Sequence, residues 1–131
     1  MTILSRDDIL KVSDITLEKV SVPEWGGDIY VKGLTGAERD AFEQSLVVSK
    51  GKSRAVNMNN FRAKLAALTI CDADGVRMFE DSDMRLLTQK SAAALQRVFV
   101  VARRLSNIQN EDVEELTETL EADPFEDSPS A

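Results

Sequence analysis

The spacing of apolar and polar positions predicts one β-hairpin near the start of the chain and helices along most of the rest. Residues 16–22 and 28–32 alternate apolar with polar side chains, which is typical of strands with one buried face. Between them, a proline and two adjacent glycines favour a turn. We therefore expect a two-stranded hairpin over about residues 16–32.

Helices are predicted wherever apolar side chains recur every three or four residues. The predicted ranges are about 5–12, 35–48, 58–71, 83–90 and 92–106. Three of these helices have serine N-caps, at Ser5, Ser82 and Ser91. Thr35 and Glu38 have the spacing of a capping box, in which each side chain binds the backbone N–H of the other residue, so they mark the start of the second helix.

The helix at 92–106 has the clearest amphipathic pattern in the chain. Its apolar positions are Leu95, Val98, Phe99, Ala102 and Leu105, which all fall on one helical face. We expect this stripe of five residues to form the main ridge of the core. Leu65 and Leu68, from the helix at 58–71, should be buried against that ridge.

The segments between these elements are more polar. Residues 49–57 contain a glycine and several basic residues and are expected to form a mobile surface loop, while residues 72–75 form a turn and residues 76–79 a short strand. Farther on, residues 110–122 are predicted to form an acidic amphipathic helix. Its narrow apolar stripe consists of Val113, Leu116 and Leu120.

With 131 residues, the chain is long enough for one domain with a modest core. The predicted fold class is α+β and mostly α-helical, with a single folded domain over residues 1–109. That domain consists of a small N-terminal β-hairpin followed by a compact helical bundle. The last residues, 123–131, are acidic and contain prolines, so we expect a disordered C-terminal tail.

The net charge of −7 is concentrated at the C-terminal end. Residues 110–131 hold nine of the 23 acidic residues and none of the 16 basic ones, so the rest of the chain is nearly neutral. An acidic end repels nucleic acid and anionic membranes. No apolar run approaches the roughly twenty residues that span a bilayer, and the first ten residues lack the apolar run of a signal peptide. We expect no nucleic-acid and no membrane partner.

The composition also excludes several kinds of chemistry. The chain has no histidine, so Ser-His-Asp and Cys-His catalytic arrangements are impossible. A single cysteine, Cys71, allows no internal disulfide and no thiolate zinc site, and its helical pattern predicts burial. The acids of residues 72–83 do not have the spacing of an EF-hand calcium loop. We expect no enzyme, no cofactor and no metal site.

Two regions are candidates for binding a partner. Trp25, the only tryptophan, lies in the hairpin turn with Tyr30 nearby. It is either a lid over the core or an exposed anchor, because tryptophan is enriched among interface hot spots. The second region is the stripe of Val113, Leu116 and Leu120.

Several segments together resemble a known family. An N-terminal "SRDDIL", the run "VPEWGGDIYVKGLTGAERD", a later "ICDADGVRMF" and an acidic end rich in proline and serine are similar to the tail assembly chaperones of long-tailed bacteriophages and prophages. The resemblance covers about residues 5–127.

This resemblance implies a small helper protein that binds the tape-measure protein, keeps it soluble and helps to recruit the major tail-tube protein. Such a chaperone works in the host cell cytoplasm and is absent from the mature virion. A homo-oligomer is a further partnership that we consider. The alternatives are a structural virion component, such as a head–tail connector or tail-completion protein, and an adaptor or antitoxin-like regulator with an acidic tail.

Deletion of residues 110–131 should leave the fold intact. The deletion removes nine negative charges and little apolar area, so the melting temperature should change by only a few degrees. Circular dichroism and thermal melts of the truncated protein measure this. An unfolded truncated chain would show instead that Val113, Leu116 and Leu120 belong to the core.

Overall fold

The computed structural model describes residues 2–50, 53–56 and 60–108, and the side chains of 2–47 and 60–108. Its elements are α1 (Arg6–Lys11), β1 (Leu17–Val22), a 3-10 turn η1 (Pro23–Trp25), β2 (Gly27–Lys32), α2 (Gly36–Ser45), β3 (Val47–Lys50), β4 (Ser53–Val56), α3 (Phe61–Thr69), β5 (Ile70–Cys71), a 3-10 turn η2 (Asp81–Asp83), α4 (Met84–Leu87) and α5 (Ala92–Leu105). The predicted α+β class, with an N-terminal hairpin and helices after it, is confirmed. The predicted helix at 110–122 and tail at 123–131 lie outside the described residues.

The N-terminal hairpin is part of a three-stranded antiparallel sheet with the order β1-β2-β5. In the hairpin, Val20 is opposite Ile29 and Val22 is opposite Gly27. The third strand was not predicted. It adds Ile70 opposite Val31 and Cys71 opposite Tyr30. One face of this sheet therefore presents aliphatic side chains to the core.

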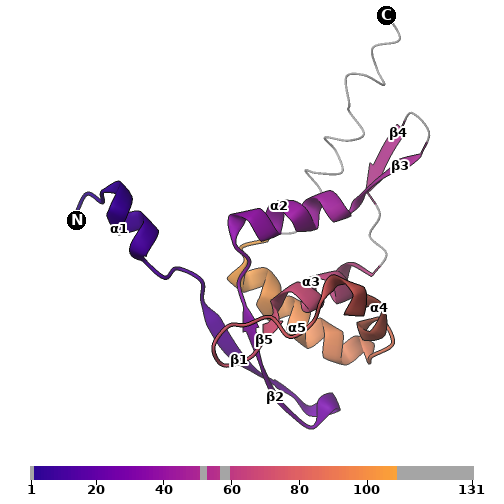
Figure 1. Ribbon diagram of the computed structural model, residues 1–131. Coiled ribbons are helices and arrows are strands. Elements are labelled where there is room, and N and C mark those ends of the chain that lie inside the picture. The colour runs from indigo at the N-terminus through magenta and orange to yellow at the C-terminus, as the bar shows by residue number, and fades with distance from the viewer. Residues whose placement is uncertain (1, 51–52, 57–59, 109–131) are drawn as a thin grey trace, which may run out of the picture.

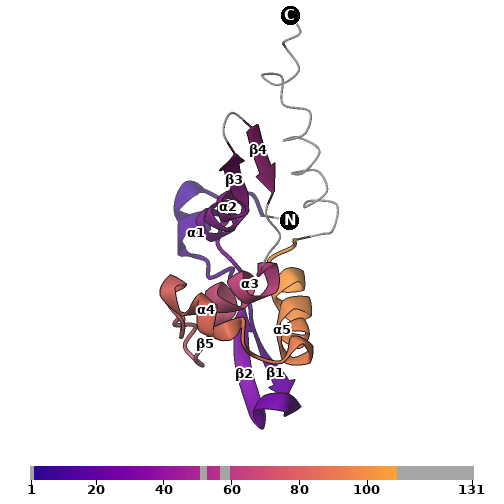
Figure 2. The ribbon, with the colours of Figure 1, turned by 90° about the vertical axis from the view of Figure 1, so that its right-hand side faces the viewer.

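Helix α5 covers that apolar face, and α3 packs beside it (Figures 1 and 2). Leu95, Val98, Phe99 and Ala102 of α5 are buried, as is Leu65 of α3, so these core predictions are confirmed. Leu68 and Leu105 differ, because each is only half-buried at the edge of the core.

Three phenylalanines join α2, α3 and α5. The ring of Phe61 lies 5.1 Å from that of Phe42 and 5.3 Å from that of Phe99, measured between centroids. The guanidinium of Arg62 lies 5.1 Å from the centroid of Phe99, a distance at which a cation is attracted to a ring face. This cluster holds α2 on the side of the helical layer away from the hairpin corner.

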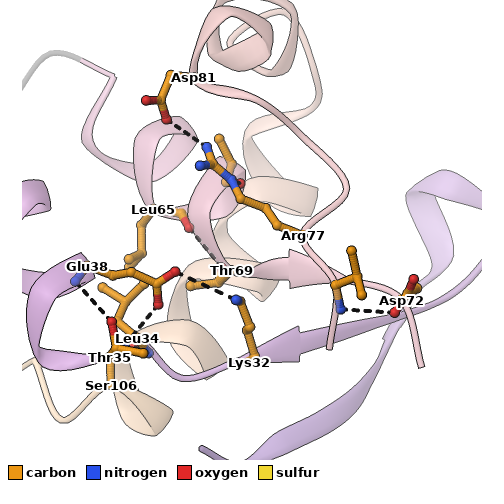
Figure 3. Close-up of polar contacts among 12 residues, drawn as sticks. Lys32, Leu34, Thr35, Glu38, Leu65, Thr69, Asp72, Arg77, Asp81 and Ser106 are labelled. Carbon is orange, nitrogen blue, oxygen red and sulfur yellow. Dashed lines mark hydrogen bonds and ion pairs between the residues drawn. The ribbon is translucent and has the colours of Figure 1, made fainter. Parts of the chain in front are cut away.

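The end of β2 meets the end of α5 at a very close approach. A Cβ atom at Gly33 would lie 2.7 Å from the carbonyl oxygen of Leu105, so only glycine fits there without a shift. Next to it, the backbone N–H of Leu34 donates to the hydroxyl of buried Ser106 at 3.0 Å (Figure 3). These contacts fix the point at which the chain leaves the sheet for α2.

A second polar contact fixes the segment after β5. Asp72 accepts hydrogen bonds from the backbone N–H groups of Asp74 and Val76, at 2.8 and 3.0 Å, which confirms the predicted turn. Arg77 then donates to the carbonyl oxygen of Ala67 at 2.8 Å and to Asp81 at 2.8 Å (Figure 3). Its guanidinium thus binds one of the last carbonyls of α3, whose helical partner is missing.

The expected mobile loop over 49–57 is wrong, because β3 and β4 form an antiparallel hairpin there. Its register pairs Val47 with Val56 and Lys50 with Ser53. The two residues between the strands in the sequence, Gly51 and Lys52, lie outside the described residues. A glycine in a two-residue connection is a hairpin signal. The basic residues around it led to the loop prediction. Because β3 begins at Val47, α2 ends at Ser45 rather than near residue 48.

Two other predicted boundaries differ from the structure. Helix α3 spans 61–69 rather than 58–71, because Ile70 and Cys71 extend to pair with β2; residues 57–59 lie outside the description. Likewise, α4 spans only 84–87 of the predicted 83–90. Ser82 does not cap it. The preceding turn is held by Asp83, which accepts from the backbone N–H of Glu80 at 2.9 Å.

The predicted strand at 76–79 is also wrong. Among the described residues, its β pairing consists of one bridge, between Arg77 and Cys71. The segment is instead held by backbone hydrogen bonds to the end of the sheet, including one from Met78 N–H to the Ile70 carbonyl at 3.1 Å.

Phe99→Ala should lower the free energy of unfolding by about 2–5 kcal/mol, because it leaves a cavity between α3 and α5. Val100→Ala is the matched control on the same helix. Val100 is 47% exposed, so its truncation should cost no more than about 0.5 kcal/mol. Chemical denaturation measures both. Equal midpoints for the two variants would contradict the assignment of Phe99 to the core.

Gly33→Ala should destabilise the protein by about 1–3 kcal/mol, because the new methyl group would collide with the Leu105 backbone. Gly36→Ala is the control. No atom lies within 4 Å of a Cβ at Gly36, and alanine favours the helix that begins there. Thermal melts should therefore show a lower midpoint for the first variant and an unchanged or higher midpoint for the second.

Candidate functional site

The hairpin corner is clamped to α5 by an ion pair. Arg97 of α5 donates through Nε to both carboxylate oxygens of Glu24, at 2.9 and 3.1 Å. The hydrogen bond from Arg97 holds the pKa of Glu24 below its ordinary value, so this carboxylate is charged at neutral pH. The corner therefore has a fixed position relative to the core.

Trp25 follows Glu24 in this corner and packs against the hydrophobic core. Its indole Nε1 is enclosed, and no described residue accepts a hydrogen bond from it. The side chain as a whole is only half-buried. Trp25 therefore covers part of the core with one part of its indole ring, and the rest of the ring faces outward.

Tyr30 does not join Trp25 in one surface. Its strand neighbours Ile29 and Val31 point to the core, so Tyr30 lies on the opposite face of the sheet, across from Lys19 and Cys71. The other three predicted binding residues, Val113, Leu116 and Leu120, lie outside the described residues. As partner-binding residues, all five stay predictions.

The most apolar exposed surface lies elsewhere, on an N-terminal arm formed by residues 2–14. Every residue of the arm is exposed, and Figure 1 shows α1 standing clear of the body. Its exposed apolar side chains are Ile3 (94%), Leu4 (60%), Ile9 (56%), Leu10 (66%) and Val12 (58%). An apolar cluster of this kind, with no described residue covering it, is typical of an interaction site.

A complete capping box explains why so short a helix forms on the arm. The Ser5 hydroxyl accepts from the backbone N–H of Asp8 at 3.2 Å, and Asp8 accepts from the backbone N–H of Ser5 at 3.0 Å. The backbone hydrogen bond from Ser5, and then the one from its hydroxyl, lower the pKa of Asp8. Spacing and capping predicted the helix and its cap, but no role was predicted for its apolar residues. The sequence did hold a signal for such a role, because a six-residue helix cannot by itself bury both Ile9 and Leu10.

A groove of about 280 Å³ lies between α2, α3 and α4. Its residues are Ala41, Phe42, Ser45, Lys64, Ala67, Leu68, Asp81 and Met84. Most of the lining is apolar, which explains why Leu68 is not fully covered. Lys64 crosses from α3 to α2, donating to the carbonyl oxygen of Ser45 at 3.1 Å. We call this feature the α2–α4 groove.

Other features of the described residues offer little chemistry. The thiol of Cys71 is fully buried, and this burial raises its pKa, so it is a poor nucleophile. No group of three or more acidic or thiol side chains is placed to hold a metal ion in the described part. Of the helices in that part, none has the length and apolar character that a membrane span requires.

Comparison with known families gives a direct result. A family model for phage tail assembly chaperones matches residues 10–118. No curated protein and no solved structure matches the chain. The matched range runs from the end of α1 through the sheet and helices α2 to α5, so the predicted resemblance is confirmed. The family is not an enzyme class, and its role implies phage tail proteins as partners. This chain belongs to the phage tail assembly chaperone family.

Proposed function

We propose that this chain binds the tape-measure protein of its phage, keeps it soluble and helps to recruit tail-tube subunits. It acts in the host cell cytoplasm and leaves before the virion is complete. The observation that carries the proposal is the family match over residues 10–118. A body without a metal cluster or a reactive thiol in its described part suits a protein that works by binding.

The client in this proposal is an apolar helical segment, which needs apolar surface that the chaperone's own core does not consume. The hairpin corner offers part of this surface. Its ion pair holds Trp25 in place, and the outward part of the indole can contact a client at little cost in side-chain entropy. The stripe of Val113, Leu116 and Leu120 offers the rest. The surrounding acids would keep an unloaded chaperone soluble and attract basic client segments.

Co-expression tests the function. The tape-measure protein of the same phage should be largely insoluble alone and soluble with the chaperone, and it should co-purify with it. Mass spectrometry of purified virions should then find no chaperone. A tape-measure protein that stays insoluble, or a chaperone present in virions at a fixed copy number, would contradict the proposal and favour a structural virion component.

Trp25→Ala should reduce the amount of client held per folded chaperone. Val31→Ala is the control, because Val31 is fully buried in the same hairpin and its truncation lowers stability without altering the corner surface. Both variants are compared with wild type by thermal melts and by co-purification, with the client signal scaled to the folded fraction. If both hold the client equally well per folded molecule, Trp25 is only a lid.

A further inference from the structure

The outward face of α5 combines positive charge with an exposed apolar residue. Val100 lies near the middle of this face and is 47% exposed. Gln96 lies one helical turn before it, and Arg103 and Arg104 lie one turn after it. Arg62 of α3 joins them, because its Nε donates to the side-chain oxygen of Gln96 at 2.6 Å. We call these five residues the basic face.

Positive charge is in excess on this part of the molecule. Helix α3 has two basic residues, α5 has three, and neither helix has an acidic one. Glu24 of the hairpin corner pairs with Arg97 at 2.9 Å. Glu18 of β1 pairs with Arg104 at 2.6 Å. The hairpin thus balances two of the five charges, and the excess lies toward α3.

Two of the cations lie against the same aromatic ring. The guanidinium carbon of Arg62 is 5.1 Å from the centroid of Phe99, and that of Arg103 is 5.6 Å from it. The ring and the Gln96 amide, which Arg62 contacts, are both neutral. Two like charges held at one ring repel each other, so a negative group beside them stabilises the arrangement. The basic face therefore favours an acidic ligand that also has an apolar surface for Val100.

The end of α5 determines where the acidic part of the chain begins. Asn107 has a positive φ of 55°, and the N–H of Ile108 donates to the carbonyl oxygen of Arg103 at 2.9 Å. These are features of a Schellman turn, which closes a helix. Ile108 is buried, so residue 109 starts beside the basic face. Helices joined by so short a turn are usually antiparallel neighbours.

Residues 110–122 have the composition that the basic face favours. They contain six acidic residues and no basic one, together with the apolar stripe of Val113, Leu116 and Leu120. A helix over this range is about 20 Å long, which is close to the length of α5. We propose that residues 110–122 fold back as a helix onto the basic face of their own chain. The stripe covers Val100, and acidic side chains lie beside Arg62 and Arg103.

The covalent connection favours this segment over other acidic ligands. A short tether gives it a local concentration of about a millimolar at the basic face. The N-terminal arm is a weaker candidate, since it holds both signs of charge and leaves the body at the start of β1. The contact includes one exposed valine, so it contributes little to folding and opens easily. Under the proposed function, a client that binds the stripe must first displace it from the basic face.

Disulfide trapping tests the docking without a client. Leu120→Cys is combined with Ala93→Cys, an exposed position near the start of α5, which an antiparallel segment reaches. The comparison chain combines Leu120→Cys with Ala41→Cys, an equally small exposed residue at the α2–α4 groove. The buried Cys71 is not expected to compete. The first pair should form a disulfide within one chain about tenfold faster than the second, because docking brings its thiols together.

Charge removal tests what holds the segment in place. Arg62→Gln together with Arg103→Gln should slow the first disulfide about fivefold or more, and salt at about 1 M should do the same. The matched control, Lys19→Gln with Arg85→Gln, removes the same charge from exposed positions on β1 and α4 and should leave the rate unchanged. Figure 2 shows α4 and α5 on opposite sides of α3. Thermal melts establish that each variant is folded.

Four results would overturn the proposal. They are equal oxidation rates for the two cysteine pairs, faster oxidation of the pair with Ala41→Cys, a first disulfide that forms only between two chains, and a rate in folded protein that the loss of Arg62 and Arg103 leaves unchanged. The second result would place the segment in the α2–α4 groove, and the third would place it on another copy. No client is present, so the outcome is independent of tape-measure binding.

Discussion

Helix α5 must bury its apolar stripe on two sides at once, and the rest of the structure is arranged around that requirement. One side lies on the valines of the β1–β2 hairpin, and the other lies against α3. Burying a large aliphatic or aromatic side chain contributes about 1.5–3 kcal/mol. With 14 residues, α5 is the longest helix among the described residues, and it contacts both the hairpin and α3. The positions of the hairpin and of α3 therefore follow from their packing on α5.

Polar contacts set the positions at which the chain turns back toward this helix. Gly33 and Ser106 bring the end of β2 onto the end of α5, so that α2 starts at a defined point. Arg77 joins the end of α3 to the turn before α4. Arg104 binds Glu18 near the start of β1, and Arg97 binds Glu24 in η1, just after the end of β1. Exposed ion pairs are worth little individually, and their effect here is to fix register rather than to supply most of the stability.

The packing around α5 also explains which surfaces are left for partners. The hairpin, α3 and α5 form most of the core, and the aromatic contact of Phe42 with Phe61 attaches α2 to it. Beside that contact, Ala41 and Ser45 of α2 do not pack closely against α3 and α4 but line the α2–α4 groove. The arm precedes the sheet and has no position in the core to occupy. A tail assembly chaperone must meet other proteins during assembly, and these are the surfaces that the described part of its fold leaves uncovered.

The sequence by itself determined the elements whose signals are local. The hairpin, the capping boxes at Ser5 and Thr35, the span of α5 and its buried stripe all follow from spacing and capping within a few residues, as does the family resemblance. Tertiary structure alone decided the third strand, because Ile70 and Cys71 suit a helix equally well until β2 offers unpaired backbone groups. It also decided that Trp25 and Tyr30 lie on different faces, that Leu68 borders a groove, and that the arm finds no place on the body. Those outcomes depend on which distant residues come together, and periodicity within one segment carries no information about its neighbours in space.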